Sequence, residues 1–173
     1  MRPVPYDHPD ATALIDEVQR EYVRRYGEKD VSPVDPAQFS PPRGLFLVGY
    51  LGDRPVASGG WRVRDADPDL VDGDVEVKRM YVVPAARGRG LARMVLAELE
   101  HTARAAGHLR VMLETGVRQP EAIALYRSCG YTRVPSFGTY KDSPDSVFLG
   151  KRLRPAGNEF DEEDQWLSTR SAT

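Results

Sequence analysis

The chain has 173 residues, of which 40% are hydrophobic and 29% charged, as is typical of a globular protein with one domain. Its formal net charge of −2 argues against a nucleic-acid binder, which usually has a concentrated basic surface. No apolar run approaches the ~20 residues of a membrane span, and the first residues lack the apolar core of a secretory signal. Cys129 is the only cysteine, so no internal disulfide is possible and a cytoplasmic location is expected.

The N-terminal half predicts one helix followed by an antiparallel meander. Leu14, Val18 and Tyr22 recur at helical spacing. Gly27 follows them as a helix stop. Two apolar segments flank the turn residues 51–53, which indicates a β-hairpin. The expected elements are a helix from the N-cap Asp10 to about Tyr26, a proline-rich loop over 30–44, strands over 44–50 and 54–63, and a third strand from Val75.

The second half predicts a strand–helix–strand crossover between Val75 and Thr115. Leu91, Val95 and Leu99 form one helical stripe. A helix that connects two strands of one sheet requires a parallel pair. The remaining expected elements are the end of that helix at Gly107, a strand over 109–115, a helix opened by Gln119-Pro120-Glu121 and ended by Gly130, and strands over 132–137 and 146–153.

Together these elements predict a mixed α/β sheet in one domain over residues 1–153, built as a meander, a crossover, and a C-terminal helix and hairpin. Residues 154–173 hold five acids between Glu159 and Asp164. We expect these last residues to form an acidic tail, for which disorder is one option.

The turn Arg87-Gly88-Arg89-Gly90 lies where a strand feeds a helix. Glycines there expose backbone N–H groups that have no intrahelical partner, and the helix macrodipole adds positive charge. This combination predicts a phosphate or pyrophosphate site, to which Arg87, Arg89 and Arg93 add charge. A tight turn with solvated arginines is the other interpretation.

Two other nucleotide motifs fit this turn less well. A dinucleotide site has the pattern G-x-G-x-x-G and an acid at the end of the next strand. Gly88, Gly90 and Glu114 partly meet that pattern, but Arg93 occupies the third small position. A single crossover is also too little for a doubly wound sheet. The nucleoside-triphosphate pattern G-x-x-x-x-G-K-[ST] is absent.

The segment from Arg87 to Ala92 reads R-G-R-G-L-A and resembles [QR]-x-x-G-x-[GA], the acyl-CoA pyrophosphate loop of the GNAT N-acetyltransferase superfamily. A second segment, LETGVRQPEAIALYRSCGY, resembles the family's closing strand, helix and tyrosine in register. The likeness runs from about Gly44 to Leu153, and the family's mixed sheet matches the expected element order. The resemblance implies the GNAT acyl-CoA N-acyltransferase fold and an acetyl-CoA-dependent N-acetyltransferase. A non-catalytic acyl-CoA-binding sensor module is the alternative.

The resemblance also assigns roles to residues. The backbone of Met80 to Val82 would pair with the pantetheine arm like an added strand. Tyr126 matches the general acid that protonates the departing thiolate, although a core aromatic is its alternative. Gln119 stands where many members have a cofactor-contacting asparagine. The implied cofactor-binding residues are Met80, Tyr81, Val82, Arg87, Gly88, Arg89, Gly90, Leu91, Ala92, Arg93, Gln119 and Tyr126.

Two glutamates are candidates for the residue that handles the amine proton. A lysine-like ammonium has a pKa near 10.4 against roughly 4.3 for glutamate, a gap worth about 8 kcal/mol. A catalytic glutamate therefore needs a raised pKa, a water relay, or a mainly orienting role. Glu76 is the first candidate, because it lies six residues before Val82, where one branch of the family keeps its glutamate. Glu114 is the rival, because another branch uses an acid there.

Each glutamate also has a structural interpretation. Strand alternation places Glu76 and Lys78 on one face and Arg79 on the other, unless a bulge of the kind usual in this family shifts the register. Glu76 could then form an ion pair with either cation. Glu114 could anchor its turn as a satisfied carboxylate.

The amine acceptor is left open by the sequence. The family acetylates protein N-termini, lysines, polyamines, antibiotics and small amino compounds. Asp72, Asp74 and Glu76 hint at a cationic acceptor, and five aromatic residues are candidates for its pocket wall. No metal is expected, because the three histidines lack ligand spacing. Dimers are usual in the family, so a homodimer is also allowed. The aromatic candidates are Tyr22, Tyr26, Phe39, Phe137 and Tyr140.

Overall fold

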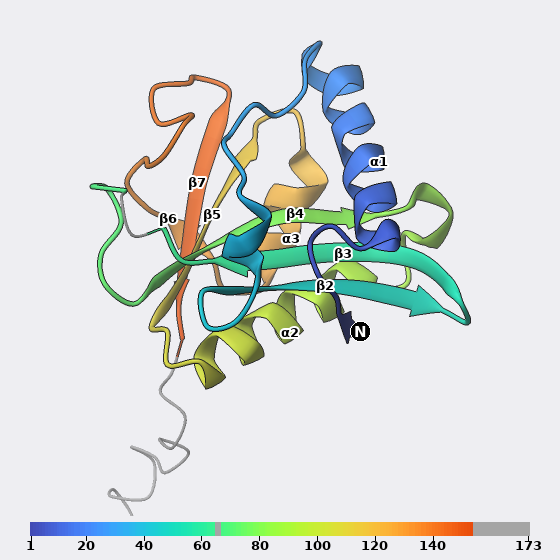
Figure 1. Ribbon diagram of the computed structural model, residues 1–173. Helices are drawn as coiled ribbons and strands as arrows, with labels where there is room; N and C mark the ends of the chain where they lie inside the picture. Colours follow the sequence, from blue (N-terminus) through green and yellow to red (C-terminus); the bar gives the residue numbers. More distant parts are fainter. Residues whose placement is uncertain (65–66, 154–173) are drawn as a thin grey trace, which may run out of the picture.

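The computed structural model describes residues 1–64 and 67–153 and places them in one seven-stranded mixed sheet with three α-helices (Figure 1). The strand order is β1-β2-β3-β4-β5-β7-β6. The strands are β1 (Arg2–Pro3), β2 (Gly44–Leu51), β3 (Arg54–Arg62), β4 (Asp74–Val82), β5 (Arg110–Gly116), β6 (Thr132–Arg133) and β7 (Ser146–Arg152). The helices are α1 (Pro9–Tyr26), α2 (Leu91–Ala105) and α3 (Pro120–Ser128), with 3-10 turns η1 (Pro36–Phe39) and η2 (Pro84–Ala86). The acidic tail predicted over 154–173 lies outside the described residues.

Most expected elements are confirmed, with four differences in detail. The N-cap of α1 is His8 rather than Asp10, because the His8 ring nitrogen Nδ1 accepts the Asp10 N–H at 3.2 Å. Strand β1, which was not expected, adds to the edge of β2. The proline-rich loop contains η1. Strand β6 is shorter than the predicted 132–137, since Pro135 cannot donate to a strand ladder.

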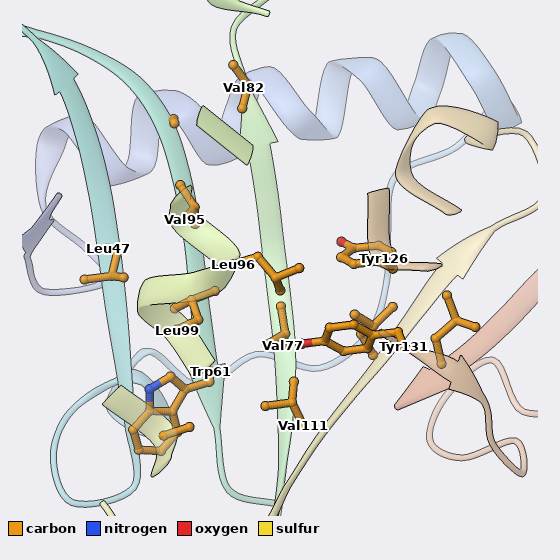
Figure 2. Packing of buried hydrophobic residues seen from close by; sticks show 14 of the residues in the cluster. Leu47, Trp61, Val77, Val82, Val95, Leu96, Leu99, Val111, Tyr126 and Tyr131 are labelled. Atoms are coloured by element: carbon orange, nitrogen blue, oxygen red, sulfur yellow. The ribbon is translucent and has the colours of Figure 1, made fainter. Parts of the chain in front are cut away.

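The core lies on both faces of the sheet. Helix α2 packs on one face through Val95, Leu96 and Leu99, which contact buried residues of the central strands (Figure 2). Helix α1 covers the opposite face with a second buried cluster that includes Leu14 and Val18. Burial of such aliphatic side chains contributes roughly 1.5–3 kcal/mol each. The two helices therefore fix the sheet between them.

The sheet splits between β4 and β5. These strands are parallel, as predicted, but they pair only from Asp74 with Arg110 to Glu76 with Met112. Beyond that point β4 continues to Val82 along β3, whereas β5 continues along β7 to Gly116. Figure 1 shows the two strands diverging, with α3 beside the gap. The split leaves backbone groups of β4 facing an opening in the middle of the sheet.

A β-bulge in β4 accompanies the split and confirms the predicted irregularity. The register with β3 shifts between Ser58 and Gly60, and Arg79 has a φ of 58°. The Ser58 hydroxyl donates to the Arg79 carbonyl at 3.1 Å and helps to hold the bulge. A Cβ added to Gly59 would lie 2.8 Å from the Met80 sulfur, so this position opposite the bulge requires glycine.

The last turn of α1 bridges the open end of the split. The Arg25 guanidinium donates to the Arg118 carbonyl at 2.7 Å, and the Arg118 guanidinium donates to the Arg25 carbonyl at 2.9 Å. Arg25 also forms an ion pair with Glu121 at the start of α3. Gly116 at the end of β5 leaves room for the Tyr26 hydroxyl, which a Cβ there would strike. Helix α1 is thus tied to the β5–α3 side of the opening.

Candidate active site

A cavity of about 230 Å³ lies in the opening between β4 and β5. Its walls come from α1 and the loop after it, the bulged part of β4, the end of β5, the start of α3, and the segment before β7. The lining side chains used below are Tyr22, Tyr26, Asp30, Lys78, Arg79, Met80, Glu114, Gln119, Tyr126, Tyr140 and Ser146.

The edge of β4 that borders this opening carries the residues expected to bind a pantetheine arm. Pairing with β5 ends at Glu76, so Met80, Tyr81 and Val82 have no partner strand on that side among the described residues. The Val82 carbonyl accepts a hydrogen bond from the Arg87 Nε at 3.0 Å. An unpaired strand edge is a template for an extended ligand.

The N-terminus of α2 opens toward solvent as the motif predicts. Gly88 and Gly90 have φ values of 77° and 76°, in the left-handed region that favours glycine. A Cβ on either glycine would meet nothing within 4 Å, so the turn is open. In the part of the chain that the structure describes, no side chain caps this helix. Its first N–H groups are therefore available to an anion such as a diphosphate, and the residues present fit that group.

The arginines of this turn have different surroundings. Arg87 lies near Glu21, at 3.4 Å, as well as bonding to Val82. Arg93 donates to the Ser128 hydroxyl at 2.8 Å and to the Cys129 sulfur at 3.0 Å, which ties α2 to the end of α3. Cys129 is half-buried against the main core cluster, as a small apolar residue would be. The contact between Cys129 and the Arg93 guanidinium could not be predicted from the sequence.

Tyr126 is a buried aromatic residue that also lines the cavity, and its role as the general acid stays a prediction. It lies on α3 with 6% of its surface exposed, and its ring packs 5.7 Å from that of Tyr131. It also lines the cavity, and Figure 2 shows its hydroxyl directed toward β4. Burial raises the pKa of Tyr126 above its usual range, and the charge of Glu114 adds to that effect. The phenol therefore stays protonated and can donate.

Gln119 is the N-cap residue of α3 and lines the cavity. Its amide lies 3.5 Å from the Tyr26 hydroxyl. This contact orients the amide at the mouth of the opening. A direct bond from Gln119 to a cofactor stays a prediction.

The two candidate glutamates lie in different environments. Glu114 on β5 lines the cavity, and its Oε1 accepts a hydrogen bond from the Ser146 hydroxyl at 2.8 Å. Burial raises the pKa of Glu114, and the opposing charge of Lys78 only partly offsets that rise. A raised pKa is the property that the proton transfer requires.

Glu76, in contrast, is only 2% exposed and is not among the lining residues. Its Oε2 accepts a hydrogen bond from Arg62 Nε at 2.9 Å, and Arg64 lies 3.5 Å away. Burial opposes ionisation, but the neighbouring cations, Lys78 first, outweigh it and lower the pKa of Glu76. Asp74 is likewise paired, with Arg110 at 2.6 Å. Asp74 and Glu76, two members of the acidic run that hinted at a cationic acceptor, therefore have internal partners, whereas Asp72 is exposed.

Asp30 joins three segments at the cavity and was not anticipated. Its carboxylate forms an ion pair with Arg79 at 2.5 Å and accepts a hydrogen bond from the Tyr140 hydroxyl at 2.9 Å. Lys78 lies 3.9 Å away. The bulge thus turns Lys78 and Arg79 toward one carboxylate, where regular alternation would separate them. No local pattern in the proline-rich loop marks Asp30.

The five aromatic candidates divide into two groups. Tyr22, Tyr26 and Tyr140 line the cavity, as expected of a pocket wall. Phe39 and Phe137 belong instead to buried core clusters.

Within the described residues, no group of three or more histidine, cysteine or carboxylate side chains could hold a metal ion. No helix in that same part of the chain is long and apolar enough to cross a membrane.

Comparisons with known proteins agree with this geometry. The model of the Acetyltransferase (GNAT) family matches residues 11–131. The IAA acetyltransferase of Azospirillum brasilense is 37% identical over 140 residues, which cover 81% of this chain and 88% of that protein. The uncharacterized N-acetyltransferase YsnE of Bacillus subtilis is 34% identical over 124 residues, 66% of this chain and 82% of its own length.

Solved structures show the same fold. A protein from Klebsiella pneumoniae superposes with a TM-score of 0.72 at 28% identity, over 88% of this chain and 96% of that one. A GNAT-family acetyltransferase from Streptococcus pneumoniae superposes with a TM-score of 0.66 at 20% identity, over 88% and 98% of the two chains. The predicted fold class and enzyme class are confirmed. The chain belongs to the GNAT family of acetyltransferases.

Proposed function

We propose that this enzyme transfers the acetyl group of acetyl-CoA directly to a primary amine of a small molecule or peptide. Family membership implies acetyl-CoA as the cosubstrate, and its thioester supplies the activated acetyl group. The observation that carries the proposal is the split sheet. The free edge of β4 and Tyr126 border the opening that it creates, and the uncapped start of α2 follows β4 in the chain.

Main-chain groups hold the cosubstrate in this proposal. Met80 to Val82 offer strand-like hydrogen bonds to the pantetheine amides, and Gly88 to Arg93 offer N–H groups to the diphosphate. Gln119 adds a side-chain amide at the mouth. This arrangement sets the thioester beside Tyr126, and such positioning supplies much of the expected acceleration.

Two residues handle the protons. The reaction exchanges a C–S bond for a C–N bond, and the acceptor ammonium loses two protons, of which one ends on sulfur and one in solvent. Glu114 accepts a proton from the nitrogen of the acceptor, because it lines the cavity and because its raised pKa reduces the difference between its pKa and that of the amine. Tyr126 gives its proton to the departing sulfur and recovers one from the solvent side.

Glu76 has a positioning part in this scheme. Its lowered pKa makes it a weak base, and its carboxylate is engaged with Arg62. Its Oε1 lies 3.5 Å from the Lys78 ammonium, whose place at the cavity it helps to fix.

Thiol release from acetyl-CoA across a panel of amines tests the proposal. Tyr126→Phe is expected to lower kcat by about 100-fold with little change in the KM of acetyl-CoA, because general acid catalysis is lost while binding remains. A melting curve controls for the packing of the ring against Tyr131. Unchanged turnover of Tyr126→Phe would remove its role as the acid.

The pH profile identifies the base. The wild-type kcat/KM, expressed per unprotonated amine, falls on the acid side with an apparent pKa above that of an ordinary glutamate, and Glu114→Gln loses this limb. Glu76→Gln is the matched control, since it removes the other carboxylate. If only Glu76→Gln abolished the acid limb, the assignment would pass to Glu76. Binding of acetyl-CoA without thiol release to any amine would favour the sensor interpretation.

A further inference from the structure

We propose that the acceptor amine also carries a carboxylate, and that the Lys78 ammonium binds it. The acceptors are then amino acids or similar zwitterions. This inference rests on the proposed function, because it names the acceptor of that same reaction.

Lys78 has donors to spare at the floor of the cavity. Its side chain is 8% exposed and lines the cavity from β4. Its Nζ lies 3.5 Å from Glu76 Oε1 and 3.9 Å from Asp30 Oδ2, and it makes no hydrogen bond within the described residues. An ammonium has three N–H donors, and the Lys78 Nζ keeps accessible surface, since it is not one of the fully buried polar atoms that lack a partner. A ligand oxygen in the cavity can therefore accept a hydrogen bond from it.

The two carboxylates nearest to Lys78 are each closer to another cation. Glu76 bonds to Arg62 at 2.9 Å and Asp30 pairs with Arg79, so the contacts of Lys78 at 3.5 Å and 3.9 Å are the longer ones. An ammonium that shares its carboxylate partners with closer cations can bind a further carboxylate from a ligand in the cavity.

The opposite wall of the opening carries the complementary charge. Glu114 lines the same cavity from β5, and the charge of Lys78 opposes the rise of its pKa. A cation on β4 and a carboxylate on β5 match the carboxylate and ammonium of one zwitterion. A polycation would instead meet Lys78 and Arg79.

Three tyrosines besides Tyr126 also line the cavity: Tyr22, Tyr26 and Tyr140. Their rings offer a surface on which an apolar or aromatic side chain of the acceptor packs. Phenylalanine, leucine and methionine are therefore suitable probes. Each can be compared with its carboxamide and with the corresponding amine that lacks the carboxyl group.

The wild-type enzyme gives the first test. Thiol release is measured for each matched set, and kcat/KM is expressed per unprotonated amine, because loss of the carboxylate changes the pKa of the amine. A hydrogen bond to a charged group contributes about 1.5–3 kcal/mol, so we expect kcat/KM to be at least about tenfold higher for the carboxylate. Equal or faster turnover of the carboxamides would overturn the inference while leaving acetyl transfer to amines intact.

Variants locate the preference. Lys78→Met is expected to bring the ratio of carboxylate to carboxamide kcat/KM close to one, and Lys78→Arg to restore most of it. Lys141→Met is the matched control, since Lys141 is an exposed lysine paired with Asp69 outside the cavity, and it keeps the wild-type ratio. If Lys78→Met does not fold, the inference is tested by the ratio of carboxylate to carboxamide kcat/KM in the wild-type enzyme and in Lys78→Arg. No thiol release with any amine would instead contradict the proposed function itself.

Discussion

The turn before α2 and the side-chain cluster around Lys78 at the opening are built differently. The turn uses consecutive residues and main-chain N–H groups, with φ values of 77° and 76° at Gly88 and Gly90. The cluster uses side chains brought together from distant segments, such as Asp30 and Tyr140, which are 110 positions apart. The first region depends on backbone conformation, whereas the second depends on single charges. We therefore expect removal of a charge to damage the cluster and strain in the backbone to damage the turn.

The largest effect is expected from a charge removed in the cluster. Arg62→Met leaves the buried Glu76 carboxylate without its 2.9 Å partner, which should cost about 3–5 kcal/mol of unfolding free energy. Denaturant unfolding measures this loss. The double variant Arg62→Met with Glu76→Met should recover much of it, since no buried charge is then left unpaired. A loss of unfolding free energy below about 1 kcal/mol for Arg62→Met would contradict the claim that the cluster depends on single charges.

A backbone substitution in the turn should affect ligand binding as well as folding. Gly90→Val places a β-branched residue at a φ of 76°, which costs roughly 1–3 kcal/mol and distorts the N–H groups of the turn. We expect the Kd of CoA, from calorimetry, to rise about tenfold or more. Gly52→Val is the matched control, because Gly52 has a φ of 60° in the β2–β3 turn, away from the opening. A similar loss of CoA affinity in Gly52→Val would show that strain alone is responsible.

The smallest effect concerns a carboxylate that ties α1 to the turn before α2. Glu21 binds Arg24, Arg25 and Arg87, and although burial opposes ionisation, these cations lower its pKa from 4.5 to about 2. The resulting stability is fully present above pH ~4.5 and is lost as the pH falls toward about 2. Glu21→Gln should flatten the melting temperature against pH in that window and cost less than about 1 kcal/mol at neutral pH. An unchanged acid slope would show that Glu21 is not the group that titrates.

Local patterns in the sequence predicted the scaffold and the turn. The helical stripe of Leu91, Val95 and Leu99, followed by a glycine stop, was enough to predict a crossover and hence the parallel pair of β4 and β5. The glycines of the turn marked the start of α2 because their conformation is a property of a few adjacent residues. Errors arose where two neighbouring residues can take the same role or where one residue ends an element. His8 caps α1 in place of Asp10, and Pro135 shortens β6.

The acceptor side could not be predicted in the same way. The alternative interpretation of Glu76, an ion pair with Lys78, is confirmed at 3.5 Å, but its closer partner Arg62, across the β3–β4 pair, was not anticipated. The meeting of Lys78 and Arg79 at Asp30 depends on the bulge at Arg79, which interrupts the alternation of a regular strand. Asp30 comes from a loop whose path only the fold defines.

The bridge from α1 to the β5–α3 connection has a mechanical consequence. A sheet whose central strands lose their mutual hydrogen bonds could hinge about the last shared pair, Glu76 and Met112. The reciprocal guanidinium–carbonyl bonds of Arg25 and Arg118 act as a strut across that gap. We therefore expect the width of the mouth to be set during folding, so that substrates enter a slot of fixed span without having to separate the two strands.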